Sequence, residues 1–436
     1  MYQYNSTDKT IVEQRVAQFR DQTRRFIDGK LSDDAFLQLR LRNGLYIQKY
    51  APMLRIAIPY GTLASNQLRA LAKVTEQYDK GYGHFTTRQN LQINWPELKD
   101  VPDILDDLSK VEMHAIQTSG NCIRNITSDP LAGINTQEIT DPRPYCELIR
   151  QWSTFHPEFY YLPRKFKIAV TGTEDNRAVV RSHDIGLIIV KNAAGEIGFR
   201  VLVGGGLGRT PVVGQVIHEF IPEQQILSYL EAIIRVYNIH GRRDNMYKAR
   251  IKILVKSLGI EAYKQQVEKV WLKLRDKRDL ILKSDKIAKF KAFFVQEYPQ
   301  ASQLQPEQLA TDTAFKNWYQ HNTLEHKQPG YRVAYVCLKH PDNIPGDITA
   351  DNMRLVADLA DKYGLGIIRT VVDQNLMLEV KQQDLYSLWQ TLDAVQLAYP
   401  NIDTATNIIC CPGLDLCSLA NAYTVNISQQ LNQELA

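Results

Sequence analysis

The spacing of hydrophobic residues changes at about residue 50. Before that point Val12, Val16 and Phe19 recur at the intervals of an amphipathic helix, and most other positions are polar. Residues 1–50 are therefore predicted to form a helical arm. From Met53 the segment LRIAIPYG alternates in the manner of a strand, so the chain enters a different kind of structure there.

A strand–helix–strand unit follows this change, and it occurs twice. Its predicted parts after the first strand are a helix over residues 66–78, a second strand in GHFTTRQNLQINW and a helix in VPDILDDLSKV. A shift of 285 positions carries Gly61 onto Gly346, Arg69 onto Arg354, Ala72 onto Ala357, Tyr78 onto Tyr363 and Gly81 onto Gly366. It also places the QNL signature of residues 89–91 on the QNL signature of residues 374–376. Each copy alone would leave a sheet edge and a face uncovered, so the copies are expected to pair about a pseudo-two-fold axis.

The rest of the chain is predicted to be mixed in structure. Strands are expected in RKFKIAV, DIGLIIVKN and IGFRVLVGGG, and helices between about residues 222 and 296. The expected organisation is an arm over 1–50, a first half-repeat over 51–125, an α/β region over 126–300, a polar linker over 301–330, a second half-repeat over 331–398 and a third, unfinished unit over 399–436.

Composition narrows the class of protein. Of 436 residues, 44% are hydrophobic and 23% charged, as in globular proteins, and no apolar run is long enough to span a membrane. The polar start lacks the features of a secretory signal, so a cytoplasmic location with no membrane association is expected. Six cysteines, three of them clustered near residue 411, suggest a metal site and do not resemble a disulfide framework.

Charge is unevenly distributed. The net charge of +4 is too small to indicate nucleic-acid binding, and no RNA-binding module is recognisable. Basic residues nevertheless dominate residues 242–291. They can be solvated helix faces, or they can form a docking surface for an acidic protein or cofactor.

Two segments carry polar or basic side chains at strand spacing. If GHFTTRQNLQINW is one strand, a single face presents Thr86, Arg88, Asn90, Gln92 and Asn94. In RKFKIAV, Lys165 and Lys167 share a face while the strand continues into apolar residues. Both faces can be ordinary solvent-exposed surface. Near a core, however, two adjacent ammonium groups would call for an anionic ligand.

Two further motifs are ambiguous by themselves. VLVGGGLGRTP follows an apolar strand but lacks both the P-loop ending and the spacing of a dinucleotide fingerprint. It can instead let backbone approach a flat cofactor at Gly206, with Arg209 near its acidic groups. In NIICCPGLDLCSLA, Cys411 and Cys417 are suited to a soft metal or an iron–sulfur cluster, although two thiolates make only half a site.

Six segments, in this order, resemble the sulfite and nitrite reductase hemoprotein family over nearly the whole chain: TTRQNLQINW, NCIRNITSDP, LPRKFK, GGGLGRTP, DQNLMLEV and CPGLDLCSLA. The resemblance implies an α+β fold of two ferredoxin-like half-domain repeats, plus mixed α/β siroheme and iron–sulfur domains of which the last is incomplete. It implies siroheme and a 4Fe-4S cluster as cofactors.

The resemblance also implies roles for individual residues. It assigns catalysis to Arg55, Arg124, Lys165 and Lys167, siroheme binding to Thr86, Arg88, Asn90, Gln92, Gly206 and Arg209, and cluster ligation to Cys411 and Cys417. Siroheme carboxylates and an anionic substrate would supply the negative charge that the paired lysines require.

The implied activity is the assimilatory six-electron reduction of sulfite to sulfide, which serves cysteine biosynthesis. Nitrite reduction is the alternative within the family. In that branch the second residue of the lysine pair tends to be Asn, so Lys167 favours sulfite. An inactive scaffold is a further alternative, because the family's second cysteine pair, CxxxC, is absent. The implied electron donor is an NADPH-dependent flavoprotein or a ferredoxin.

Overall fold

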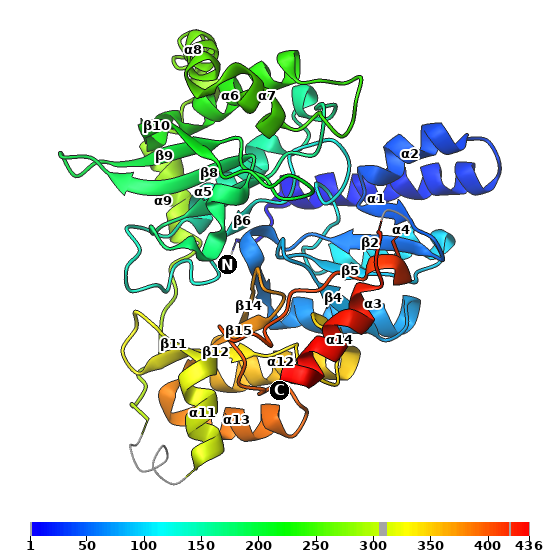
Figure 1. Cartoon of the computed structure of the whole chain (residues 1–436), viewed down its shortest axis with the longest axis vertical. Coiled ribbons are helices and arrows are strands. Elements are labelled where there is room, and N and C mark those ends of the chain that lie inside the picture. The colour runs from blue at the N-terminus through cyan, green and yellow to red at the C-terminus, as the bar shows by residue number, and fades with distance from the viewer. Residues whose placement is uncertain (1, 305–311, 418–419, 436) are drawn as a thin grey trace. The chain divides into compact units, whose positions relative to one another are not determined.

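The chain divides into two compact units, which are described separately. The computed structural model describes residues 2–304, 312–417 and 420–435 (Figure 1). The first unit, here called the repeat unit, comprises Gln3–Thr118 and Gln296–Ala436. The second, here called the central unit, is Ser119–Val295 with Tyr2. Among the described residues, no helix has the length and apolar character needed to cross a membrane.

Two five-stranded sheets form the centre of the repeat unit. The first has the order β1 (Leu45–Ile47), β2 (Pro52–Ile56), β5 (Leu91–Ile93), β4 (Tyr82–Phe85), β13 (Asp347–Thr349). The second has the order β11 (Thr323–Glu325), β12 (Tyr331–Val336), β15 (Leu376–Lys381), β14 (Ile367–Thr370), β3 (Thr62–Ala64). The helices are α1 (Ser6–Ile27), α2 (Asp33–Leu41), α3 (Ser65–Tyr78), α4 (Val101–Ser109), α11 (Thr313–Asn322), α12 (Ala350–Tyr363), α13 (Leu385–Asp393) and α14 (Thr424–Leu435).

The two half-repeats exchange strands, which confirms the predicted pairing. Strand β13 of the second copy closes the edge of the first sheet on β4, while β3 of the first copy closes the second sheet on β14. The register obeys the 285-residue shift: Thr349 faces Tyr82, and Ala64 faces Ile367. Each copy thus covers an edge that the other would leave open.

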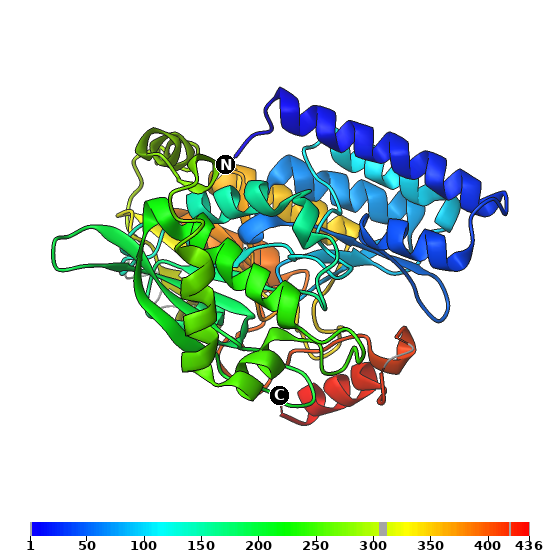
Figure 2. The same ribbon diagram turned by 90° about the horizontal axis from the view of Figure 1, so that it is seen from above.

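Helices cover these sheets through their apolar stripes. Helix α3 lies beside α12, its counterpart in the other repeat, and both contribute to one hydrophobic core. The arm also joins this core, because Val16 and Phe19 of α1 are buried and α1 lies along α4 (Figure 2). The spacing of three apolar residues therefore predicted both the helix and its buried face.

Three elements differ from the sequence predictions. The single strand predicted over residues 83–95 is in fact two strands, β4 and β5, because Gln89 adopts a left-handed conformation (φ 55°) and its N–H donates to Thr86 O. Alternation therefore stops at Thr86. The expected arm ends in a strand, β1. The stretch expected to be a linker contains α11 and β11 within its described residues.

The central unit contains one mixed sheet. Its strands, in order, are β10 (Gln215–Pro222), β9 (Ile197–Val203), β8 (Ile185–Lys191), β7 (Ile168–Thr171) and β6 (Thr127–Ser128). Its helices are α5 (Arg143–Ser153), α6 (Ile226–His240), α7 (Ile251–Leu258), α8 (Ile260–Trp271) and α9 (Ser284–Ala292). β6, β7 and β8 run parallel, whereas β9 and β10 are antiparallel to their neighbours. Strand β10 was not predicted from the sequence.

Candidate functional site

Three cations share one face of the central unit, just before β7. The backbone of Phe166 pairs in parallel with that of Ile123, and both side chains are fully buried. Residues next to a paired position point to the opposite face of a strand. Arg124, Lys165 and Lys167 therefore lie together on the other face, and all three are half-buried. These three residues are called the cationic face below.

Backbone bonds and one buried carboxylate fix this arrangement. Arg124 N–H donates to Phe166 O at 2.7 Å, and the Arg124 guanidinium turns back to Gly120 O, with its Nη2 at 2.8 Å. Asp184, which is completely buried, accepts the backbone N–H of Lys167 at 2.9 Å through Oδ2. Its Oδ1 pairs with Arg250 Nη2 at 2.7 Å. The sequence placed the two lysines on one face, but nothing local in it indicated Asp184 or Arg250.

The glycine-rich loop after β9 is tied to the same network. Gly204 N–H donates to Asp184 O at 3.1 Å. The ammonium group of Lys252 lies 3.4, 3.1 and 2.5 Å from the carbonyl oxygens of Gly206, Leu207 and Thr210. Burial, and then the neighbouring Arg250, lowers the pKa of Lys252. The loop is thus bound by a buried cation that the sequence of the loop did not indicate. A lysine within the apolar helical segment IKILVK could have suggested that this cation is buried.

The predicted siroheme-binding loop residues differ in exposure. Gly206 is buried beneath the loop surface, whereas Arg209 is exposed. A side chain at Gly206 would begin 2.8 Å from Arg250 Nη2, so the backbone lies against the charged network. An exposed arginine beside a fixed backbone is suited to binding an anionic group.

In the repeat unit, strand pairing brings Arg55 and Gln92 together. They face each other across β2 and β5, and Arg55 Nη2 donates to Gln92 Oε1 at 3.2 Å. The other three predicted residues lie in the turn between β4 and β5. Thr86 Oγ1 accepts the backbone N–H groups of Arg88 and Asn90, and Asn90 Oδ1 accepts that of Ile58. The side chains of Thr86 and Asn90 therefore stabilise the turn, and Arg88 is the half-buried cation that it carries.

The cysteine cluster lies in an irregular segment, residues 407–417, here called the cysteine segment. Cys411 is exposed and Cys417 is half-buried, but Cys410 is only 5% exposed and lies 3.3 Å from the Ser428 hydroxyl. Burial raises the pKa of the Cys410 thiol, so it stays protonated. Within this segment Cys411 and Cys417 are thus more accessible than Cys410, and their role as ligands stays a prediction.

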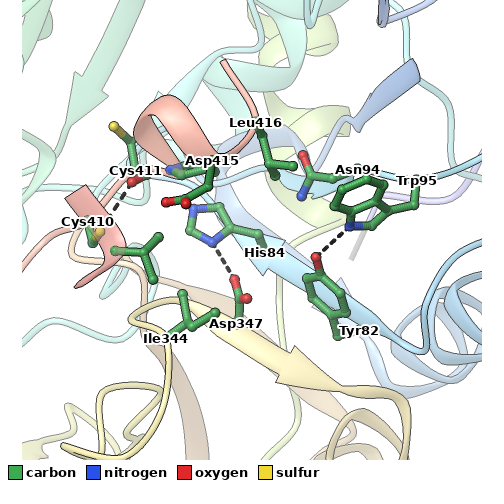
Figure 3. Close-up of a pocket in the computed structure, with 12 residues that line it drawn as sticks. Tyr82, His84, Asn94, Trp95, Ile344, Asp347, Cys410, Cys411, Asp415 and Leu416 are labelled. Atoms are coloured by element: carbon green, nitrogen blue, oxygen red, sulfur yellow. Dashed lines mark hydrogen bonds and ion pairs between the residues drawn. The ribbon is translucent and has the colours of Figure 1, made fainter. Parts of the chain in front are cut away.

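A cavity of about 240 Å³ opens beside Cys410 and Cys411 (Figure 3). His84 and Asp347 also line it, with His84 Nδ1 2.6 Å from Asp347 Oδ1. Trp95 donates to the Tyr82 hydroxyl at 2.8 Å on the opposite wall. His84 was not predicted from the sequence as a site residue, because it follows a glycine in a strand and belongs to no recognised motif.

The thiols do not make up a cluster site by themselves. In residues 2–304, 312–417 and 420–435, no three His, Cys, Asp or Glu side chains form a group that could hold a metal ion. Cys411 and Cys417 could contribute two of the four thiolates that a 4Fe-4S cluster takes. The cationic face and Arg209, by contrast, fit a macrocycle that bears carboxylates.

Comparisons with known protein families cover both units. A model described as "Nitrite/Sulfite reductase ferredoxin-like half domain" matches residues 47–111 and 326–395. A model described as "Nitrite and sulphite reductase 4Fe-4S domain" matches residues 119–274. The two half-domain matches fall on the two repeats that share the 285-residue shift.

Individual relatives carry both names of the family. The chain is 27% identical over 384 residues to sulfite reductase [ferredoxin] 1 of Mycolicibacterium paratuberculosis, covering 88% of this chain and 62% of that protein. It is 31% identical over 335 residues to the chloroplastic ferredoxin–nitrite reductase of Arabidopsis thaliana, covering 75% and 51%. The solved structure of the Mycobacterium tuberculosis NirA protein matches with a TM-score of 0.76 and 25% identity, over 93% of this chain and 71% of that chain. The chain therefore spans between half and two thirds of the length of these two curated relatives.

Proposed function

Because the chain belongs to the nitrite and sulphite reductase family, whose members carry siroheme and a 4Fe-4S cluster, we propose that it serves the six-electron reduction of sulfite to sulfide. The cationic face of Arg124, Lys165 and Lys167 is the observation that carries this proposal. Its three positively charged residues lie on one half-buried face, which suits an oxyanion.

The lysine pair favours sulfite over nitrite. Sulfite carries up to two negative charges near neutral pH and nitrite carries one, so a second ammonium group adds more to the binding of sulfite. The backbone of Lys167 is fixed because its N–H donates to Asp184. Its side chain lies on the face opposite Phe166. Replacing it with Asn would leave the backbone bond and remove the charge.

The residues of this face would also manage protons. Sulfite takes up six electrons and seven protons to give hydrosulfide and three water molecules, so each S–O cleavage needs a nearby proton donor. Lys165 and Lys167 can donate protons, whereas Arg124 keeps its charge and can only stabilise an anion. When bound, the siroheme and the cluster supply the electrons.

A ferredoxin is the proposed electron donor. The relatives named above are a ferredoxin-dependent sulfite reductase and a ferredoxin–nitrite reductase, which supports a ferredoxin over an NADPH-dependent flavoprotein. In this chain, residues 242–291 contain sixteen lysines and arginines and six aspartates and glutamates, which suits an acidic partner.

The test compares two substrates, using the chain co-expressed with the enzymes that synthesise siroheme. Sulfide and ammonium production from sulfite and nitrite would be measured with reduced ferredoxin. We expect a kcat/KM for sulfite at least tenfold above that for nitrite, and we expect K167N to reverse much of this ratio. A wild-type preference for nitrite, or siroheme-loaded protein that reduces neither anion, would overturn the proposal.

A further inference from the structure

The two QNL turns make one equivalent bond across the repeats. Gln89 Nε2 donates to Thr370 O at 3.0 Å, and Gln374 Nε2 lies 3.0 Å from Phe85 O. The 285-residue shift relates the two donors to each other and the two acceptors to each other. Both glutamines have left-handed backbone, with φ of 55° and 73°, so their local conformations also agree.

Gln374 has a second role, which is to hold the peptide group of Cys410. Its Oε1 accepts the Cys410 N–H at 2.9 Å, and its Nε2 lies 2.8 Å from the Cys410 carbonyl oxygen. The same amide nitrogen lies 2.9 Å from His84 Nε2, and Asp347 binds the other side of that ring. One buried amide therefore connects the cysteine segment to both half-repeats.

A second anchor lies three residues earlier, at Asn407. Asp373, which stands where the first repeat has Arg88, accepts the Asn407 side-chain amide at 3.0 Å. The ammonium group of Lys339, whose side chain is completely buried, donates to Asn407 Oδ1 at 2.8 Å. The change from arginine to aspartate between the two turns thus has a structural consequence: the second turn can accept a hydrogen bond from the side-chain amide of Asn407.

We propose that Gln374 is a positioning residue that fixes the Cys410 peptide and thereby sets the direction of the Cys411 thiol. Asp373 and Lys339 support it through Asn407. The inference rests on the proposed function and on the role of cluster ligand that the family resemblance implies for Cys411. It goes further by giving the two repeats different roles. The turn that contains Arg88 binds an anionic ligand, and the turn that contains Asp373 holds the cysteine segment in place.

The test uses the chain without cofactors and takes the buried thiol of Cys410 as its reporter. Alkylation by iodoacetamide would be followed by peptide mass spectrometry, with Cys337, fully buried in the same unit, as internal reference. We expect Q374M to raise the Cys410 rate at least tenfold relative to Cys337. Loss of overall stability would expose both thiols to the same extent and would not raise this ratio.

Q89M is the matched control, because it removes the equivalent cross-repeat bond, which Gln89 makes to the carbonyl oxygen of Thr370. We expect it to leave the Cys410 to Cys337 ratio within twofold of the wild type. An unchanged ratio in Q374M, or an equal rise in both variants, would overturn the proposal.

If Q374M does not fold, N407A tests the attachment of the same segment at a half-buried position. We expect a severalfold rise in the Cys410 to Cys337 ratio, and no rise would contradict the proposal. Neither sulfite nor siroheme enters this assay, so its outcome is separate from that of the substrate comparison.

Discussion

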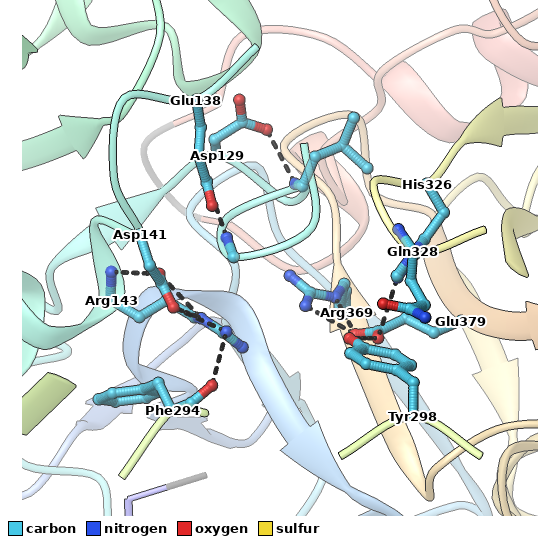
Figure 4. Close-up of polar contacts among 12 residues, drawn as sticks. Asp129, Glu138, Asp141, Arg143, Phe294, Tyr298, His326, Gln328, Arg369 and Glu379 are labelled. Carbon is cyan, nitrogen blue, oxygen red and sulfur yellow. Dashed lines mark hydrogen bonds and ion pairs between the residues drawn. The ribbon is translucent and has the colours of Figure 1, made fainter. Parts of the chain in front are cut away.

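Arg369 and Glu379 form an ion pair within the second sheet, with Arg369 Nη2 2.6 Å from Glu379 Oε1 and both side chains almost completely buried (Figure 4). Tyr298 and His326 lie 2.7 and 3.4 Å from the second oxygen of the carboxylate. Two charges out of water are tolerated only when each is paired and hydrogen-bonded. The network therefore stabilises the pairing of β14 with β15 only while all its members are present.

Removing the charge of Glu379 is expected to be severely destabilising. E379Q should lower the free energy of unfolding by about 3 kcal/mol or more, because Arg369 would remain buried without its counter-charge. Urea unfolding would measure the loss. The matched control is E76Q, which breaks the exposed Arg354–Glu76 pair between α3 and α12 and should change stability little. Equal effects in the two variants would contradict the assignment.

The same carboxylate should make stability depend on acid pH. Burial alone would raise the pKa of Glu379, but Arg369, His326 and Tyr298 outweigh it and hold that pKa well below its usual range. A group with a depressed folded-state pKa contributes stability above its unfolded pKa of about 4.3, and this contribution is lost as the pH falls below that value. Unfolding midpoints from pH 6 to pH 3 should therefore fall more steeply in the wild type than in E379Q. Parallel curves would rule out this contribution.

Lys252 is expected to control the order of the glycine-rich loop. K252M would leave the carbonyl groups of Gly206, Leu207 and Thr210 without their shared donor, at a cost of about 2 kcal/mol. Hydrogen exchange in residues 204–213 should accelerate at least tenfold. The control is K256M, one helical turn further along α7 at an exposed position, where exchange in the loop should stay as in the wild type.

Gly205 is expected to tolerate no side chain for steric reasons. A Cβ atom there would lie 2.4 Å from Arg181 O and 2.5 Å from His183 O, both backbone atoms that cannot move independently. G205A should therefore cost more than G195A, whose Cβ meets nothing within 4 Å and whose penalty of about 1 kcal/mol arises only from its positive φ. Thermal unfolding of both variants would compare them. A milder effect at Gly205 would show that the loop can shift to accept a methyl group.

Features that depend on local spacing could be predicted from the amino-acid sequence alone. The 285-residue shift gave two half-repeats and predicted their pairing, because each unit has one apolar face and one open edge. The two-residue interval gave Lys165 and Lys167 a common face. Apolar spacing gave the helix over residues 66–78, which the structure places at Ser65–Tyr78.

Contacts between distant residues depend on the folded structure. Arg124 joins the lysine pair only because Ile123 and Phe166 align two segments 43 positions apart, an alignment that no local period encodes. The polar face predicted over residues 86–94 is divided by a turn, since the conformation of Gln89 is stabilised by its bond to Thr370 in the other repeat. The two QNL signatures look equivalent in sequence, and their different roles arise because only one of them lies against the cysteine segment. Contacts of this kind form when the folded chain brings its segments together, so their chemistry cannot be read from either segment alone.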